Sequence, residues 1–161
     1  MRAKQLELLF ADAAAKLGLE GAQLDENNSC TIVSQYEGVP AVNVRYDAEN
    51  DIADLYSEIG LVAEEDKDLY RELLTDNFFG TGTRGAVFSL APDSGVLVLS
   101  RELRVASLDA DELAAALANL MDVALEARRR LYQRAESLPE DDPSAEDEVF
   151  NPPPPEPRFE A

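Results

Sequence analysis

The apolar positions near the start of the chain follow the periodicity of an amphipathic helix. Five residues recur at helical spacing: Leu6, Leu9, Phe10, Ala13 and Leu17. This spacing places their side chains on one face of a helix over residues 3–17, which Gly18 ends. Leu8 lies on the opposite face, where a surface helix of a monomer would normally show charge. One interpretation is a single exposed leucine, which is common, and the other is a docking face for another protein.

Three short runs rich in β-branched and aromatic residues follow, over residues 30–36, 41–46 and 52–59. Segments containing Gly, Pro, Asn and Asp separate them, and such short turns are typical of an antiparallel meander. In the second run every other residue is apolar, so we expect one face of the sheet to be covered.

A second helix is predicted from the acidic residues at 64–66 to about residue 79, before Gly80, because carboxylates favour a helix N-terminus. Its apolar residues occupy almost half of its circumference, which is wider than the stripe needed to cover one sheet. We infer that this helix contacts two surfaces, one of its own chain and one of another.

A hairpin and a last helix complete the pattern. Residues 86–90 and 96–99 flank a Pro-Asp-Ser-Gly turn, and the second of these strands is apolar on both faces. Such a strand needs cover on both sides, either from its own chain or from a partner. The last helix begins at Asp109, which forms a capping box with Glu112. The predicted fold is α+β: helix, three strands, helix, two strands, helix, with a twisted antiparallel sheet covered by helices.

The composition changes at residue 136. Residues 136–161 contain nine acidic residues, one arginine and most of the prolines, including the run 152–155. We therefore expect residues 1–135 to form one folded domain and residues 136–161 to be a disordered, acidic, Pro-rich tail that folding does not require. Two hypotheses describe its role. The tail is a solubilising brush, or Val149, Phe150 and Phe159 dock, either on a partner or in the chain's own binding groove until a ligand displaces them.

The charge and the missing residue types exclude several classes of function. The chain of 161 residues has 14 basic and 33 acidic residues, a net charge of −19, which disfavours nucleic acid as a partner. It contains no His and one Cys, Cys30, so the usual general base and the common zinc ligand sets are missing. With no apolar run of 18 residues and charged residues among the first leucines, we expect no membrane span, no signal peptide and a cytoplasmic location.

Three motifs suggest chemistry that their context does not support. Residues 80–85 match G-x-G-x-x-G, but they follow a predicted helix and enter a strand, the reverse of a dinucleotide site. Residues 47–51 alternate carboxylates, yet Ile52 stands where a calcium loop needs Gly. The arginines at 128–130 and 134 are interpreted as an exposed helix end that pairs with Glu126 and other acidic residues. We expect no metal and no cofactor.

Four stretches in order carry a resemblance to a known family: residues 9–26, 55–60 (Leu-Tyr-Ser-Glu-Ile-Gly), 69–78 and 83–100. Together, on a small acidic chain, they resemble the class I chaperones of type III secretion systems, the Tir-chaperone-like (CesT) family. The resemblance covers about residues 5–135. It implies a cytoplasmic homodimer, not an enzyme, that binds the N-terminal segment of a secreted effector and keeps it soluble until export, with the secretion apparatus as a further partner.

Two sets of candidate site residues follow. The homodimer interface is predicted from the wide apolar stripe of the second helix and from strand 96–99, which is apolar on both faces. The candidate residues are Leu69, Leu73, Leu74, Phe78 and Val98. For effector binding, the resemblance implies the first helix and the neighbouring strands, with the candidates Leu8, Phe10, Ile32, Val44 and Tyr46. Phe10, Ile32 and Val44 are also expected in the core, so Leu8 is the informative residue.

Three hypotheses about function remain at this point. The first is the secretion chaperone. The second is a regulatory binding protein of the same fold, which sequesters a transcription factor or another chaperone. The third is an enzyme that uses carboxylates and tyrosine. Co-purification with an effector or with a regulator would separate the first two, and a screen for metal or nucleotide binding would test the third.

Overall fold

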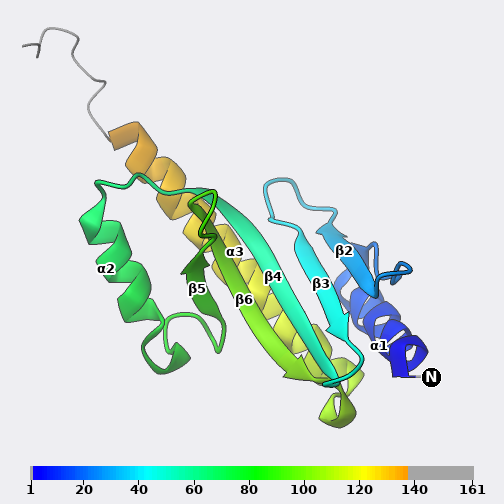
Figure 1. Ribbon diagram of the computed structural model, residues 1–161. Coiled ribbons are helices and arrows are strands. Elements are labelled where there is room, and N and C mark those ends of the chain that lie inside the picture. The colour runs from blue at the N-terminus through cyan, green and yellow to red at the C-terminus, as the bar shows by residue number, and fades with distance from the viewer. Residues whose placement is uncertain (1, 138–161) are drawn as a thin grey trace, which may run out of the picture.

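The computed structural model describes residues 2–137, which form one antiparallel sheet with three α-helices around it (Figure 1). The elements in chain order are α1 (Arg2–Leu17), β1 (Leu19–Glu20), β2 (Ser29–Ser34), β3 (Val42–Asp47), β4 (Ile52–Leu61), α2 (Lys67–Asp76), the 3₁₀ turn η1 (Phe78–Gly80), β5 (Val87–Leu90), β6 (Val96–Arg104), the 3₁₀ turn η2 (Val105–Ser107) and α3 (Ala110–Ser137). The predicted α+β order is confirmed, with the two-residue strand β1 added before the three predicted strands.

The sheet has six strands in the order β1-β2-β3-β4-β6-β5. The long strands β4 and β6 lie at its centre and pair from Ile52 with Arg104 to Leu61 with Val96, with a β-bulge between Glu58 and Gly60. The two-residue strand β1 forms one edge and the four-residue strand β5 forms the other.

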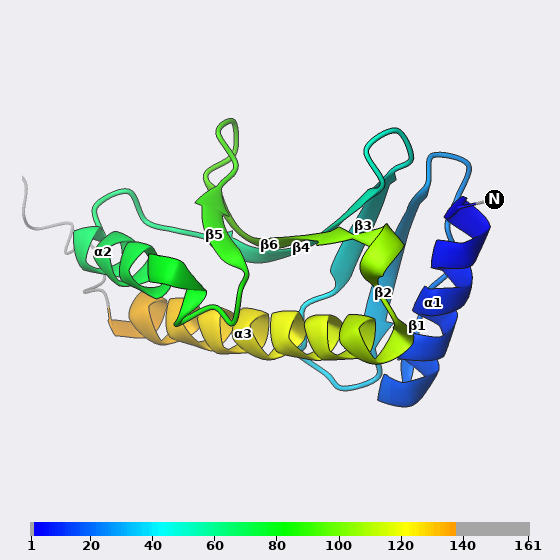
Figure 2. The same cartoon turned by 90° about the horizontal axis from the view of Figure 1, so that it is seen from below.

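Helix α3 lies along one face of the sheet, and within residues 2–137 no helix covers the opposite face (Figure 2). Helix α1 stands at the end of the sheet that holds β1 and β2, and α2 lies beyond β5 at the other end (Figures 1 and 2). The largest fully buried side chains come from α1, α2, α3 and the inner face of the sheet: Phe10, Leu6, Ile32, Leu55, Leu69, Leu97, Leu99, Leu113, Leu117, Leu120, Val42 and Val44.

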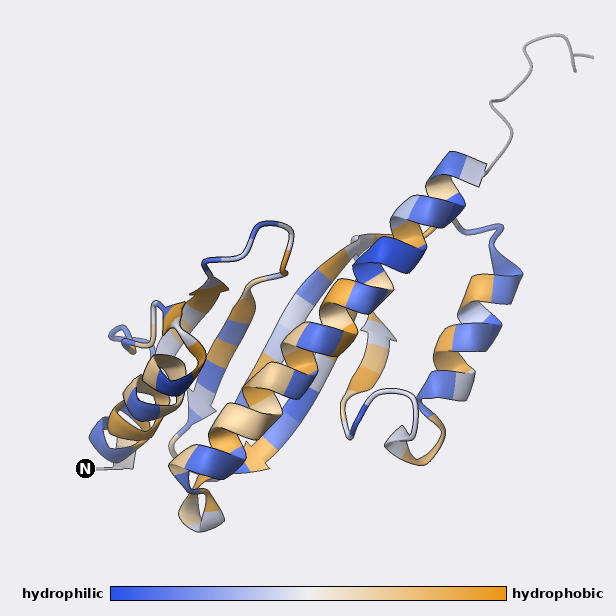
Figure 3. Cartoon of the chain, turned by 180° about the vertical axis from the view of Figure 1, so that it is seen from behind, coloured by the Kyte–Doolittle hydropathy of each residue, from blue (hydrophilic) through white to orange (hydrophobic). Residues whose placement is uncertain are grey.

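Helix α3 is amphipathic from Leu113 to Leu131. Figure 3 looks onto its outer side, where hydrophilic residues recur between apolar ones. Ten of its residues are buried, from Leu113 to Leu131. No helix among the described residues is both long and apolar enough to span a membrane.

Two elements differ most from their predicted bounds. Helix α2 begins at Lys67 and ends at Asp76, although residues 64–79 were predicted, because Asp66 caps it and the following residues turn towards β5. Strand β6 continues to Arg104 instead of ending at residue 99, because its polar second half pairs with β4. The second half of β6 faces solvent on one side, so polar residues are tolerated there and the apolar pattern ends before the strand does.

The capping box at the start of α3 is confirmed. The Asp109 carboxylate accepts a hydrogen bond from the Glu112 backbone N–H at 2.8 Å, and the Glu112 carboxylate accepts one from the Asp109 N–H at 3.1 Å. We expect Asp109→Ala to lower the free energy of unfolding by about 1 kcal/mol, because it removes this N-cap. Asp109→Ser, which keeps an acceptor, should stay close to the wild type in urea denaturation. Equal loss in both variants would contradict a capping role.

The predicted boundary at residue 136 lies in the last turn of α3, which reaches Ser137. Residues 138–161, with the candidate docking residues Val149, Phe150 and Phe159, lie outside the described residues. The predicted disorder of the tail therefore stays a prediction.

Candidate protein-binding surfaces

The largest group of exposed apolar side chains lies on α2, η1 and β5, and we call it the α2–β5 surface. It consists of Leu74, Phe78, Phe79, Val87 and Leu90. Leu74 is 70% exposed and Phe78 is 66% exposed. A groove of about 300 Å³ runs between α2 and β5, lined by Tyr70, Leu73, Leu74, Asn77, Phe88, Ser89, Leu90 and Leu97. Leu74 and Leu90 line this groove, and Leu74 and Phe78 line a neighbouring one, whereas Val87 lies on the other face of β5. Exposed apolar side chains gathered around a groove are typical of protein interaction sites.

Asn77 determines how the chain leaves α2. Its side-chain amide accepts a hydrogen bond from the Phe88 N–H at 2.7 Å and donates one to the Phe88 carbonyl at 3.0 Å. It thus takes the place of a neighbouring strand at this point of the edge of β5. Phe79, with a φ of +50°, then turns the chain so that its ring lies beside that of Phe78, 4.6 Å between centroids.

The glycine-rich segment 80–85 packs the turn between η1 and β5. A side chain at Gly82 would meet the Cα and Cβ of Asp76 at 2.8 Å, so only glycine fits there. The buried Thr83 hydroxyl donates to the Ala86 carbonyl, and Arg84 contacts Asp122 of α3 at 3.3 Å. The motif follows a helical turn and enters a strand, as its sequence context predicted, which is the reverse of the order in a dinucleotide site.

The five residues predicted for a dimer interface fall into three environments. Leu69 and Leu73 are buried within the chain, whereas Leu74 and Phe78 belong to the α2–β5 surface. Val98 is partly buried and pairs with Glu58 and Ser89, on the sheet face opposite α3. The α2–β5 surface also holds residues that were not predicted, Phe79, Val87 and Leu90. For the last two, the sequence signal was their place in the predicted strand 86–90.

Other exposed apolar side chains lie at the other end of the sheet. Leu8, on the outer side of α1, is 62% exposed, and Val33 and Tyr36, in β2 and the turn after it, are exposed at the same end. The other residues predicted for effector binding, Phe10, Ile32, Val44 and Tyr46, are all buried in the core. The Tyr46 hydroxyl donates a hydrogen bond to the Asp51 carboxylate at 2.8 Å.

Asp47, in the turn that resembled a calcium loop, and Cys30 have contacts that stabilise the fold. Asp47 accepts hydrogen bonds from the side chain and backbone of Asn50 and the backbone of Glu49, chiefly from the Asn50 side chain, and these bonds lower the pKa of Asp47. Burial raises the pKa of the Cys30 thiol to about 11, so the thiol is protonated at neutral pH. Within residues 2–137, no group of three or more His, Cys, Asp or Glu is arranged to hold a metal ion.

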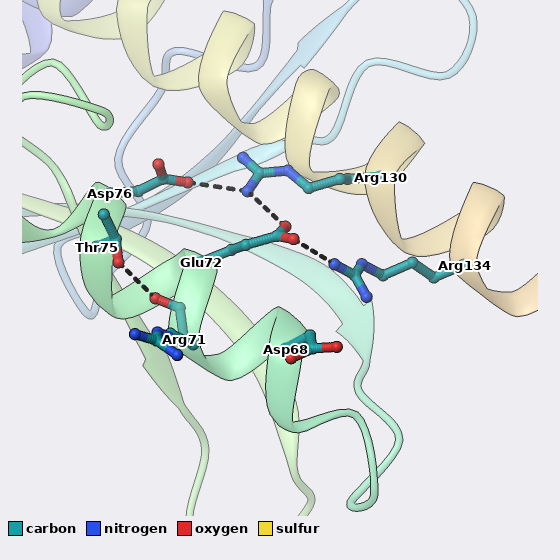
Figure 4. A pocket seen from close by; sticks show the side chains of 7 residues that line it. All are labelled: Asp68, Arg71, Glu72, Thr75, Asp76, Arg130 and Arg134. Carbon is teal, nitrogen blue, oxygen red and sulfur yellow. Dashed lines mark hydrogen bonds and ion pairs between the residues drawn. The ribbon is translucent and has the colours of Figure 1, made fainter.

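Arg128, Arg130 and Arg134 contact β4 and the α2 region, and no ion pair with Glu126, which the sequence suggested, is found among residues 2–137. Arg128 donates to the backbone carbonyls of Glu58 and Ile59. Arg130 and Arg134 form ion pairs with carboxylates of the α2 region and line a polar pocket between the two helices (Figure 4). Helix α2 offers these carboxylates because it runs alongside the C-terminal half of α3 (Figure 2).

The comparison with protein families identifies one match. Residues 9–128 match the model of the Tir chaperone protein (CesT) family. A comparison with curated protein sequences gives no match.

Several solved structures share the fold. A chain of the ExsC–ExsE complex aligns with a TM-score of 0.65 at 22% identity, over 80% of this chain and 95% of that one. The complex of the Yersinia pestis type III secretion chaperone SycH with a fragment of YscM2 aligns at 0.57 and 21% identity, over 75% and 98%. The heterodimeric ExoU–SpcU complex of the Pseudomonas aeruginosa type III secretion system aligns at 0.55 and 24%, over 77% and 94%.

Proposed function

The chain belongs to the Tir chaperone (CesT) family of type III secretion chaperones, and from this premise we propose that it binds, as a homodimer in the cytoplasm, the N-terminal segment of a secreted effector. It keeps that segment soluble and competent for secretion. The observation that carries the proposal is that large apolar side chains are exposed at both ends of the sheet. One end suits a second copy of the chain and the other end suits the effector.

The α2–β5 surface supports the homodimer. It groups five large apolar side chains that the chain's own core does not cover. Stable homodimer interfaces bury about 2,000 Å² or more and have apolar centres. The α2–β5 surface provides apolar side chains for such a centre. In this proposal Leu74 and Phe78 contact the partner, Leu69 and Leu73 support them from beneath, and Val98 borders the interface on the open face of the sheet.

The effector segment binds at the end of the sheet that holds α1. Extended segments add to exposed sheet edges and place apolar side chains in nearby grooves. Asn77 already occupies the N–H and carbonyl of Phe88 on the edge strand β5, which disfavours strand addition there. The edge beside α1 is therefore the better acceptor, and Leu8 contacts the segment while Phe10, Ile32, Val44 and Tyr46 form the rigid layer beneath it.

We propose that this binding requires no catalysis, metal or cofactor. Release then needs only a competing pull on the effector from the secretion apparatus, because each bound strand and side chain detaches without a chemical step. The secretion apparatus is thus a transient partner, and the acidic surface disfavours nucleic acid.

The proposal is tested by isolating the tagged chain from a bacterium with an active type III secretion system and identifying bound proteins by mass spectrometry. A secreted effector is the expected partner, whereas a transcription factor or a second chaperone would favour a regulatory role instead. The isolated complex then allows the docking site to be tested by substitution.

We expect Leu8→Asp to weaken effector binding about tenfold or more, because it places a charge in an apolar contact, and to leave the fold intact because Leu8 is exposed. Gln133→Asp is the matched control, since it adds the same charge at an exposed position near the C-terminal end of α3, at the end of the sheet opposite α1 (Figure 2). Binding is measured by isothermal titration with the effector's N-terminal segment. Full affinity in a dimeric Leu8→Asp protein would place the docking face elsewhere.

A further inference from the structure

We propose that Arg130 and Arg134 are positioning residues that fix α2 against α3 and thereby set the geometry of the α2–β5 surface. The claim that they hold α2 in place stands on the contacts alone. Its consequence for dimerisation rests on the proposed function.

Helix α2 has few apolar anchors of its own. It contains ten residues, of which only Leu69 and Leu73 are buried. It lies beyond the edge strand β5, outside the layer formed by the sheet and α3 (Figures 1 and 2). A helix of this length is not stable by itself in water, so its position must come from contacts with the body.

Ion pairs join the α2 region to α3. Arg130 Nη1 lies 2.9 Å from Asp76 and 3.7 Å from Glu72, and Arg134 lies 3.0 Å from Asp66 and 2.5 Å from Glu72. Figure 4 shows Glu72 between the two arginines. The Asp66 side chain is 13% exposed and that of Arg134 is 28% exposed, so water and salt screen this pair less than an ordinary surface pair.

Arg134 also acts on the start of the helix. The same oxygen of Asp66, Oδ1, accepts a hydrogen bond from the Leu69 N–H and one from Arg134, each at 3.0 Å. Arg134 therefore holds the N-cap side chain in its capping rotamer. At the far end, Arg130 holds Asp76, and Asn77 joins the helix to β5. The helix is thus fixed at both ends by polar contacts.

The two faces of α2 explain why its orientation matters. Leu73 points into the core and its neighbour Leu74 points outward, so a rotation of the helix moves both. Loss of the arginines should loosen α2 and spread Leu74 and Phe78 over many positions. Ordering them again on association would cost free energy and weaken the dimer.

The test compares the full-length protein with the double variant Arg130→Gln/Arg134→Gln by hydrogen–deuterium exchange of the α2 amides. We expect exchange about tenfold faster in the variant. Raising NaCl from about 0.05 M to about 0.5 M should speed α2 exchange in the wild type, chiefly by screening the pairs of the half-exposed Glu72, and change it little in the variant, which lacks those pairs. Arg129→Gln is the matched control, since Arg129 forms no ion pair with the described residues.

A charge reversal provides a rescue. Arg130→Asp should loosen α2, and adding Asp76→Arg should restore part of its protection, which a general loss of helix stability would not do. The proposal would be overturned if the α2 amides of Arg130→Gln/Arg134→Gln exchanged at the wild-type rate. It would also be overturned if salt changed α2 exchange equally in the wild type and in that variant.

The measurement is repeated in a Leu74→Asp background, in which no dimer is expected. Faster exchange on removal of the arginines there shows that they hold α2 in the single chain. If the arginines are shown to hold α2 but the native protein is monomeric, the proposed homodimer fails and the positioning role stands. If α2 exchange is unaffected while the native protein is a dimer, the positioning role fails alone.

Discussion

Leu74→Asp is expected to convert a homodimer into a folded monomer. Leu74 is exposed on the outer side of α2, so the charge costs the isolated chain little. In a two-fold symmetric interface both protomers carry the change, and two carboxylates then enter an apolar contact without partners. We expect the dissociation constant to rise about 100-fold or more, about 2.7 kcal/mol, as for other central interface residues.

Sedimentation at several protein concentrations measures this change. Leu8→Asp is the matched control, because it makes the same substitution at an exposed leucine at the other end of the sheet and should leave the dimer intact. Leu73→Asp should behave differently from both and unfold the protein, since Leu73 is buried. A native chain that stays monomeric at micromolar concentrations, or a dimeric Leu74→Asp variant, would contradict the proposed interface.

Local signals allowed the helices and the start of α3 to be predicted. The spacing of Leu6 and Phe10 identified α1, and the capping box of Asp109 and Glu112 identified the first turn of α3. Both depend on residues close in sequence. The second half of β6 escaped prediction because its strand structure comes from pairing with β4, which lies far earlier in the chain.

Contacts distant in sequence also explain what was missed in the candidate sites. The apolar stripe of α2 indicated two contact surfaces, but it did not tell which residue faces which way. The structure shows the two directions, because Leu73 faces the core and Leu74 faces outward. The end of α2 is determined by Asn77 and the backbone of Phe88, eleven residues later. The partners of Arg134 were unpredictable for the same reason, because Asp66 lies 68 residues before it.

Phe10→Ala is expected to cause a large loss of stability. The Phe10 side chain is fully buried in the core, and its truncation leaves a cavity where α1 meets the sheet. Substitutions of this kind cost about 3–5 kcal/mol, a large part of the roughly 5–15 kcal/mol that stabilises a domain. Leu8→Ala, on the exposed face of the same helix, should cost less than about 0.5 kcal/mol.

Urea denaturation at one fixed protein concentration compares these variants, because the stability of a dimer depends on concentration. The pair also separates the two roles assigned to Phe10, core residue and effector contact. If Phe10 only supports α1, the folded fraction of Phe10→Ala should bind effector with nearly wild-type affinity, and the observed loss of binding should follow the unfolded fraction across temperature. A folded Phe10→Ala protein with much weaker binding would instead show that the effector reaches the core through a displaced α1.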